Sequence, residues 1–194
     1  PSRRRVDVPG VRLGRRCPVS GQTTLGDTMR REAEISPCGL HRYRLTREWA
    51  PTLPTIAFVM LNPSTADGEI DDPTIRRCIG FARDLGYGRL HVVNLFTYRA
   101  TDPRELPEAL GAGIRLNGPL ADDHLVKLTY NVAASGGLVI AAWGVGLPSL
   151  ATRMNQQIAR IVPAMACLGT TKHGAPRHPL YLSRTARPVA WEPP

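Results

Sequence analysis

The sequence lacks long apolar runs and is poor in lysine and aromatic residues. No apolar stretch approaches the roughly 20 residues of a membrane-spanning helix, so the sequence predicts no membrane segment. The basic first residues are not followed by an apolar stretch, and we therefore expect no signal peptide. The four cysteines, Cys17, Cys38, Cys78 and Cys167, are scattered and form neither a metal-binding nor a disulfide pattern. These absences predict a cytoplasmic protein with free thiols.

Several signatures of catalytic machinery are also missing. The sequence shows no glycine-rich phosphate loop, no Ser-His-Asp arrangement and no spacing typical of metal ligands. We therefore expect a protein that needs neither a metal nor another cofactor.

What the sequence has in excess is arginine. The net charge is +9 and the pI about 10.1, and Lys127 and Lys172 are the two lysines among 25 basic residues. Such a charge favours a polyanionic partner such as nucleic acid, although a GC-rich genome also enriches arginine. Residues 1–28 carry six arginines against two aspartates. We interpret them as a basic N-terminal extension of a single α/β domain at residues 29–194.

The stretch at residues 55–67 is the centre of the predicted fold. Its apolar run at 55–61 is typical of a strand buried on both faces, and it stops at Asn62-Pro63-Ser64-Thr65. Apolar runs at 90–96, 138–143 and 167–169 predict further parallel strands, and the alternation at 41–47 predicts an edge strand. Helices are expected at 73–85 behind the N-cap Asp72, and at 101–106, 119–134 and 148–162. The pattern predicts a three-layer α/β sandwich around a mainly parallel sheet of four or five strands.

Polar residues follow the predicted strands at the point where each strand ends. Asn62, Asn94 and Trp143-Gly144 end three strands, and His178 lies in the polar loop after the fourth. The carboxyl ends of parallel strands share one edge of a sheet, so these groups should converge. A carboxamide offers one acceptor and two donors, which matches the edge of a nucleobase, and a histidine donates to an oxygen as charge develops on it.

Each of these residues also has a structural interpretation. Asn62 is as well suited to a turn as to a ligand, and a backbone partner would equally explain Asn94 and His178. Asp71 and Asp72 fit helix caps, whereas Asp67 lies closer to the predicted site. Arg76 and Arg77 fit either a solvated helix face or phosphate contacts.

The same residues carry a family resemblance. From about Ser36 to Trp191 the chain resembles a bacterial and phage family known as a domain of unknown function, number 1643. The matching segments are SPCGLHRYRLTREW, FVMLNPSTAD, DDPTIRRC, VVNLFTYRATDP, AAWG and LGTTKHGAPRHPLYL.

The order of these motifs is more distantly similar to the uracil-DNA glycosylase superfamily, which implies the fold of that superfamily. LNPST stands where those enzymes carry GQDPY or GINPG, and Asn62 matches the asparagine that orients the attacking water. VVNLFTY places Asn94 at the residue that reads the base. AAWG matches LLWG, and His178 in HPLYLS matches the histidine that stabilises the departing base. The chain departs from the pattern at Leu61 and at Leu180, which replace a glycine and a serine.

The resemblance implies a hydrolase that cleaves a glycosidic bond to a nucleobase, in DNA rather than RNA or in a free nucleoside or nucleotide. Catalysis would fall to Asn62 and His178, without a Schiff-base step. Further substrate contacts are expected from Asn94, Pro63, Ser64, Thr65, Asp67, Phe96, Tyr98 and Trp143. Phosphates would be held by Arg76, Arg77, Arg99, Lys172 and Arg177. The alternatives are a non-catalytic nucleic-acid or nucleotide binder that reuses the fold, and an enzyme acting on another small molecule.

Overall fold

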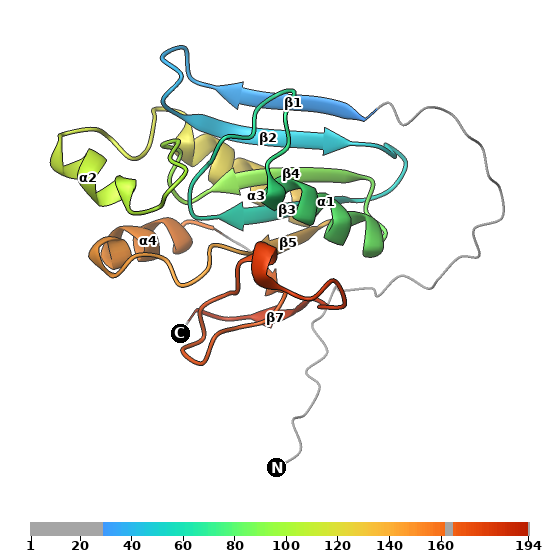
Figure 1. Ribbon diagram of the computed structural model, residues 1–194. Helices are drawn as coiled ribbons and strands as arrows, with labels where there is room; N and C mark the ends of the chain where they lie inside the picture. Colours follow the sequence, from blue (N-terminus) through green and yellow to red (C-terminus); the bar gives the residue numbers. More distant parts are fainter. Residues whose placement is uncertain (1–28, 162–164, 194) are drawn as a thin grey trace.

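A computed structural model describes residues 29–161 and 165–193 (Figure 1), so the predicted extension at 1–28 lies outside the described residues. The described chain forms one sheet of seven strands in the order β1-β2-β4-β3-β5-β6-β7. Four strands pair in parallel in the middle of this sheet, as the apolar runs predict. They are β3 (Thr55–Met60), β4 (Arg89–Asn94), β5 (Leu138–Ala141) and β6 (Met165–Cys167).

Three antiparallel strands extend the sheet beyond the predicted four or five. These are β1 (Arg30–Ile35), β2 (Arg42–Glu48) and β7 (Val189–Trp191). The sheet is therefore mixed rather than mainly parallel. The prediction of an edge strand at 41–47 is wrong, because β1 pairs with the outer side of β2 while β4 pairs with its inner side. The polar residues of β1 and the shortness of β7 gave no apolar run to detect.

Helices lie against both faces of the sheet, and the alternation of side chains along β3 shows how. Ile56, Phe58 and Met60 pack with α1 (Pro73–Asp84), whereas Ala57 and Val59 belong to the core on the opposite face. That opposite core also contains buried side chains of α2 (Glu105–Gly111), α3 (Leu128–Ala134) and α4 (Ala151–Ile158). The predicted β-α alternation is thus present, with the helices shared between the two faces (Figure 1).

The helix boundaries differ from the prediction in three places. The helix expected at 101–106 begins only at Glu105, because residues 101–104 form a turn around Asp102. The helix expected at 119–134 contains a π-helical segment, η1 (Asp123–Lys127), before α3. The helix expected at 148–162 begins as the 3-10 turn η2 (Pro148–Leu150), α4 ends at Ile158, and residue 162 is outside the described part. No helix among the described residues is both long and apolar enough to cross a membrane.

Candidate functional site at the carboxyl edge of the parallel strands

The structure brings Asn62, Asn94 and His178 to one edge of the sheet. Asn62 follows β3, and Asn94 ends β4 in register with Met60 of β3. Gly144 follows β5 with a φ of 75°, and a Cβ on it would lie 3.6 Å from the His178 Cβ. Since β3 lies between β4 and β5, Asn62, Asn94 and Gly144 lie at the ends of three adjacent parallel strands, and His178 approaches the third through Gly144. Open α/β sheets bind their ligands at this edge.

The side chain of Asn62 holds two loops together. Its Nδ2 donates to the carbonyl of Ala100 at 2.8 Å and to that of Pro63 at 3.1 Å. The backbone N–H of Ala100 in turn donates to the carbonyl of Pro63 at 2.9 Å. These contacts fix the amide group and leave Oδ1 without a partner within the described residues. Asn62 therefore presents a fixed hydrogen-bond acceptor.

Asn94 is buried without any hydrogen bond from its side chain. It is 3% exposed, and both Oδ1 and Nδ2 are enclosed without a partner in the described structure. Asn94 lies two residues after Val92, which packs with α1, and residues two apart in a strand share a face. The carboxamide of Asn94 therefore lies on the α1 face of the sheet. An enclosed polar group without a partner costs about 1–3 kcal/mol. The fold therefore carries a donor and an acceptor that only a ligand or water would pair.

His178 is arranged as a neutral hydrogen-bond donor. Its Nδ1 accepts the backbone N–H of Leu180 at 3.3 Å, at the start of the 3-10 turn η3 (Pro179–Tyr181). Burial lowers the pKa of His178, and the nearby Asp72 carboxylate opposes that shift. A neutral imidazole whose Nδ1 accepts must carry its proton on Nε2. His178 thus offers an uncharged Nε2–H donor.

The loop after β3 is held both by its own hydrogen bonds and by bonds from arginines of β2. Asp67 Oδ1 accepts the N–H groups of Glu69 and Ile70, each at 2.8 Å, and these bonds lower the pKa of Asp67. Its carboxylate therefore has a local structural role. Of the other expected contact residues in this loop, Pro63 is buried, Ser64 is half-buried and Thr65 is exposed.

The aromatic residues expected at the site lie mainly in the core on the other face. Phe96 and Trp143 are 2% and 4% exposed and pack in that core, and Tyr98 packs against it with its ring 6.2 Å from that of His41. Sequence reasoning missed Tyr181, which is exposed and has its ring 5.7 Å from that of His178. Its position three residues after His178 was the available signal.

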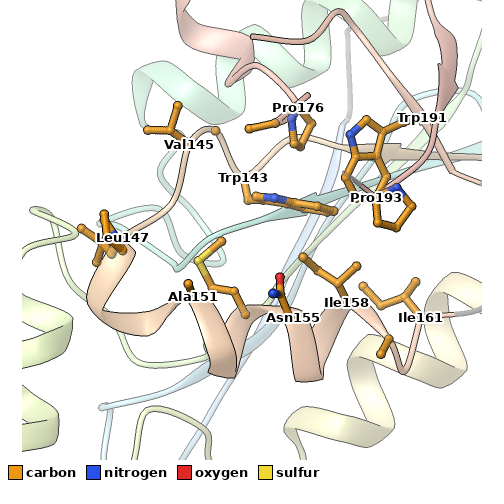
Figure 2. A pocket seen from close by; sticks show the side chains of 15 residues that line it. Trp143, Val145, Leu147, Ala151, Asn155, Ile158, Ile161, Pro176, Trp191 and Pro193 are labelled. Carbon is orange, nitrogen blue, oxygen red and sulfur yellow. The ribbon is translucent and has the colours of Figure 1, made fainter. Parts of the chain in front are cut away.

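An apolar cavity of about 510 Å³ lies beside Trp143. Figure 2 shows the Trp143 ring between Pro176 and Trp191 on one side and the α4 side chains Asn155 and Ile158 on the other. A second, more polar cavity of about 440 Å³ lies between α3 and the start of β3 and β4. Neither cavity is lined by Asn62, Asn94 or His178. A ligand therefore reaches Asn94 only if the side chains and loop above it move.

The predicted phosphate-binding residues are dispersed. Arg76 is exposed and donates to the carbonyl of Asp71, and Arg77 donates to the carbonyl of Leu182 while lying 4.9 Å from the Phe81 ring centre. Lys172 and Arg177 are exposed in the loop after β6. Arg99 is half-buried, and its Nη1 donates to the carbonyl of Gly39 at 3.3 Å.

Sequence reasoning also missed Arg42, the first residue of β2. Arg42 is 2% exposed, and its Nη1 donates to the carbonyl of Ala66 at 2.7 Å. Burial lowers its pKa to about 10, Asp72 acts to raise it, and the charge of Arg99 lowers it further. The available signal was an arginine next to the apolar residues of a predicted strand.

The described residues contain no group of three His, Cys, Asp or Glu side chains that could hold a metal ion. No curated protein and no solved structure matches the chain. Residues 42–180 match the family described as a protein of unknown function, DUF1643. That segment spans β2 to η3 and contains Asn62, Asn94 and His178. Because the match covers well over half of the sequence, the chain belongs to the DUF1643 family.

Proposed function

We propose that the protein is a hydrolase that cleaves the glycosidic bond between a nucleobase and its sugar. The observation that carries the proposal is the enclosed carboxamide of Asn94, whose donor and acceptor both lack partners among residues 29–161 and 165–193. A cyclic amide such as a pyrimidine edge supplies the complementary acceptor and donor side by side. Pairing with such a ring would remove the cost of the empty site.

The neighbours of Asn94 suit the two remaining tasks of the reaction. Asn62 Oδ1, fixed by the bonds from Nδ2 to Ala100 and Pro63, would accept a hydrogen bond from water and aim it at the anomeric carbon. As the carbon–nitrogen bond breaks, its electron pair moves onto the base. The His178 Nε2–H would donate to the base oxygen that becomes negative. The proton released by water would pass to the base or to solvent.

The order of motifs supports the same assignment. In the uracil-DNA glycosylase superfamily, which the sequence resembles distantly, an asparagine after the first strand, an asparagine on the second and a late histidine share these roles. Asn62, Asn94 and His178 occur in that order after β3, at the end of β4 and directly before η3. If the substrate base belongs to DNA, it must leave the helical stack before it can reach the strand ends.

The test is release of free base from duplexes, single strands, nucleosides and nucleotides carrying uracil and other modified bases. We expect Asn62→Ala and His178→Ala to lower the rate of release by about 100-fold or more, as for other positioned catalytic groups. Asn94→Ala should weaken base selectivity as well as rate. Asn131→Ala is the matched control, since Asn131 is exposed on α3.

Two results would contradict the proposal. Release that is unchanged in Asn62→Ala would remove the water-positioning role of that residue. Saturable binding of a base or nucleotide without release from any substrate would instead identify a non-catalytic binder. The bonds from Asn62 Nδ2 to the carbonyls of Pro63 and Ala100 are structural, which fits a non-catalytic binder.

A further inference from the structure

Two arginines share with Asn94 an enclosed side-chain nitrogen that has no partner among the described residues. The Nε atoms of Arg42 and Arg99 are enclosed without a hydrogen bond to any described residue, as are both polar side-chain atoms of Asn94, while the Arg99 Nη1 donates to the Gly39 carbonyl at 3.3 Å. The backbone brings the two arginines together, because the Arg42 N–H donates to the Thr97 carbonyl and the Arg99 N–H to the Leu40 carbonyl, each at 2.9 Å. The start of β2, the end of β4 and the segment after β4 thus supply three unpaired donors and one unpaired acceptor.

Arg47, in the same strand as Arg42, shows how this fold compensates a buried arginine. Arg47 is 0% exposed, its Nε contacts Asp71 Oδ1 at 2.8 Å, and its other nitrogens donate to four backbone carbonyls. Arg42 is nearly as buried but makes no ion pair with any described residue, and its one side-chain bond is to the Ala66 carbonyl. A buried charge without a partner is strongly destabilising. Arg42 is therefore the less compensated of the two in the empty protein.

The charges around Arg42 do not compensate its buried positive charge. The charge of Arg99 acts against that of Arg42, so two cations lie within electrostatic reach of each other. The acids within reach are Asp67 and Asp72, but each carboxylate accepts backbone N–H groups of its own turn, at Glu69 and Ile70 and at Ile75. Two guanidinium groups within electrostatic reach of each other, and without a direct carboxylate partner among the described residues, fit an oxyanion, which can accept from both.

We propose that Arg42 and Arg99 form an oxyanion site that makes a free nucleoside monophosphate the ligand of this edge, with its base at Asn94. The proposal rests on the proposed function for the base and adds the phosphate. Because Arg42 is buried, the site favours a mononucleotide over a nucleic-acid polymer. A mononucleotide can be enclosed at the buried Arg42, whereas the neighbouring phosphates of a DNA strand would have to remain at the surface.

The experiment titrates the full chain with inorganic phosphate and with nucleosides and their 5′-monophosphates, followed by calorimetry. Wild-type protein should bind the monophosphates at least about tenfold more tightly than the nucleosides. Arg42→Met and Arg99→Met should lose this difference and the binding of inorganic phosphate. Arg153→Met, an exposed arginine on α4, is the matched control and should keep both.

Melting of the unliganded variants separates a binding role for Arg42 from a structural one. Arg42→Met should melt at or above the wild-type temperature because it removes an uncompensated charge, whereas Arg47→Met should melt below it. A fall for Arg42→Met equal to that for Arg47→Met would overturn the proposal. So would equal affinity of nucleosides and monophosphates, or competition by a single-stranded oligonucleotide as strong as that by a monophosphate.

The two proposals fail in distinguishable ways. Phosphate binding that depends on Arg42, without base release from any substrate, would support the oxyanion site and remove the hydrolase. Base release that is indifferent to the 5′-phosphate and to Arg42→Met would support the hydrolase and remove the oxyanion site.

Discussion

At the scale of single residues, the candidate site consists of side chains whose hydrogen-bonding capacity the fold does not use. Within the part of the chain that the structure describes, Asn62 has a fixed amide and an unpaired oxygen, and both polar groups of Asn94 are unpaired. His178 uses Nδ1 for the backbone of Leu180 and keeps Nε2–H available. Buried polar groups are paired in nearly all proteins, so unpaired ones mark positions where stability is given up for another purpose.

This interpretation predicts the effect of replacing Asn94 by an apolar residue of similar size. Asn94→Leu should raise the free energy of unfolding by about 1–2 kcal/mol, because it removes an enclosed donor and acceptor that lack partners. Base binding should be lost in the same variant. Chemical denaturation of both proteins measures the change in stability.

Asn62→Leu provides the comparison at the neighbouring strand end. It breaks the bonds to Ala100 and Pro63, so it should lower the free energy of unfolding by about 1 kcal/mol or more. Destabilisation of Asn94→Leu by a similar amount would show that Asn94 has partners in solution and a structural role.

The sequence made Asn62, Asn94 and His178 visible because each ends or follows an apolar run. Arg42 was not visible in the same way. An arginine in a strand that alternates is expected to face solvent, and its burial depends on the loop that later returns over β2 and bonds it through Ala66. The internal bonds of Asp67 likewise depend on the turn that follows it.

At the scale of elements, α1 connects helix formation to the chemistry of the site. Asp72 caps α1 by accepting the Ile75 N–H at 2.8 Å, and the same carboxylate acts on the pKa values of His178 and Arg42. The capping role was predicted from the sequence. The electrostatic role could not be, because it depends on the return of residue 178 to the start of α1.

Substitutions at Asp72 should separate these two roles. Asp72→Ala should lower the free energy of unfolding by about 1 kcal/mol through loss of the cap, whereas Asp72→Ser keeps a capping oxygen and should cost less. Both variants remove the carboxylate that raises the pKa of His178, so that pKa should fall in both. Histidine titration by NMR gives the pKa. An unchanged pKa in Asp72→Ser would contradict the electrostatic effect of Asp72 on His178.

At the scale of the whole molecule, the parallel centre of the sheet was predictable and its margins were not. The strands β3, β4 and β5 are buried on both faces, so their apolar runs are nearly continuous. β1 carries charged residues paired to those of β2, and β7 has three residues, so neither leaves a distinct hydrophobic pattern. The antiparallel margins depend on pairings between distant segments, which periodicity does not encode.

The order and direction of the strands determine which residues meet at the candidate site. Adjacent parallel strands bring Asn62 and Asn94 to one edge, the chain after β6 returns His178 to Gly144, and antiparallel β2 adds Arg42 from the opposite direction. The match to the DUF1643 family begins at Arg42 and ends at Leu180, and so includes these residues.

The most direct test of the central claim is an NMR titration of ¹⁵N-labelled protein with free nucleobases, observing side-chain amide signals. The account predicts that at least one base shifts the Asn94 side-chain signal, assigned by its absence in Asn94→Leu, and that the Asn131 signal remains unchanged. If no base shifts the Asn94 signal, or if the shifts fall at Asn155 beside the α4 cavity instead, the strand ends are not the nucleobase site.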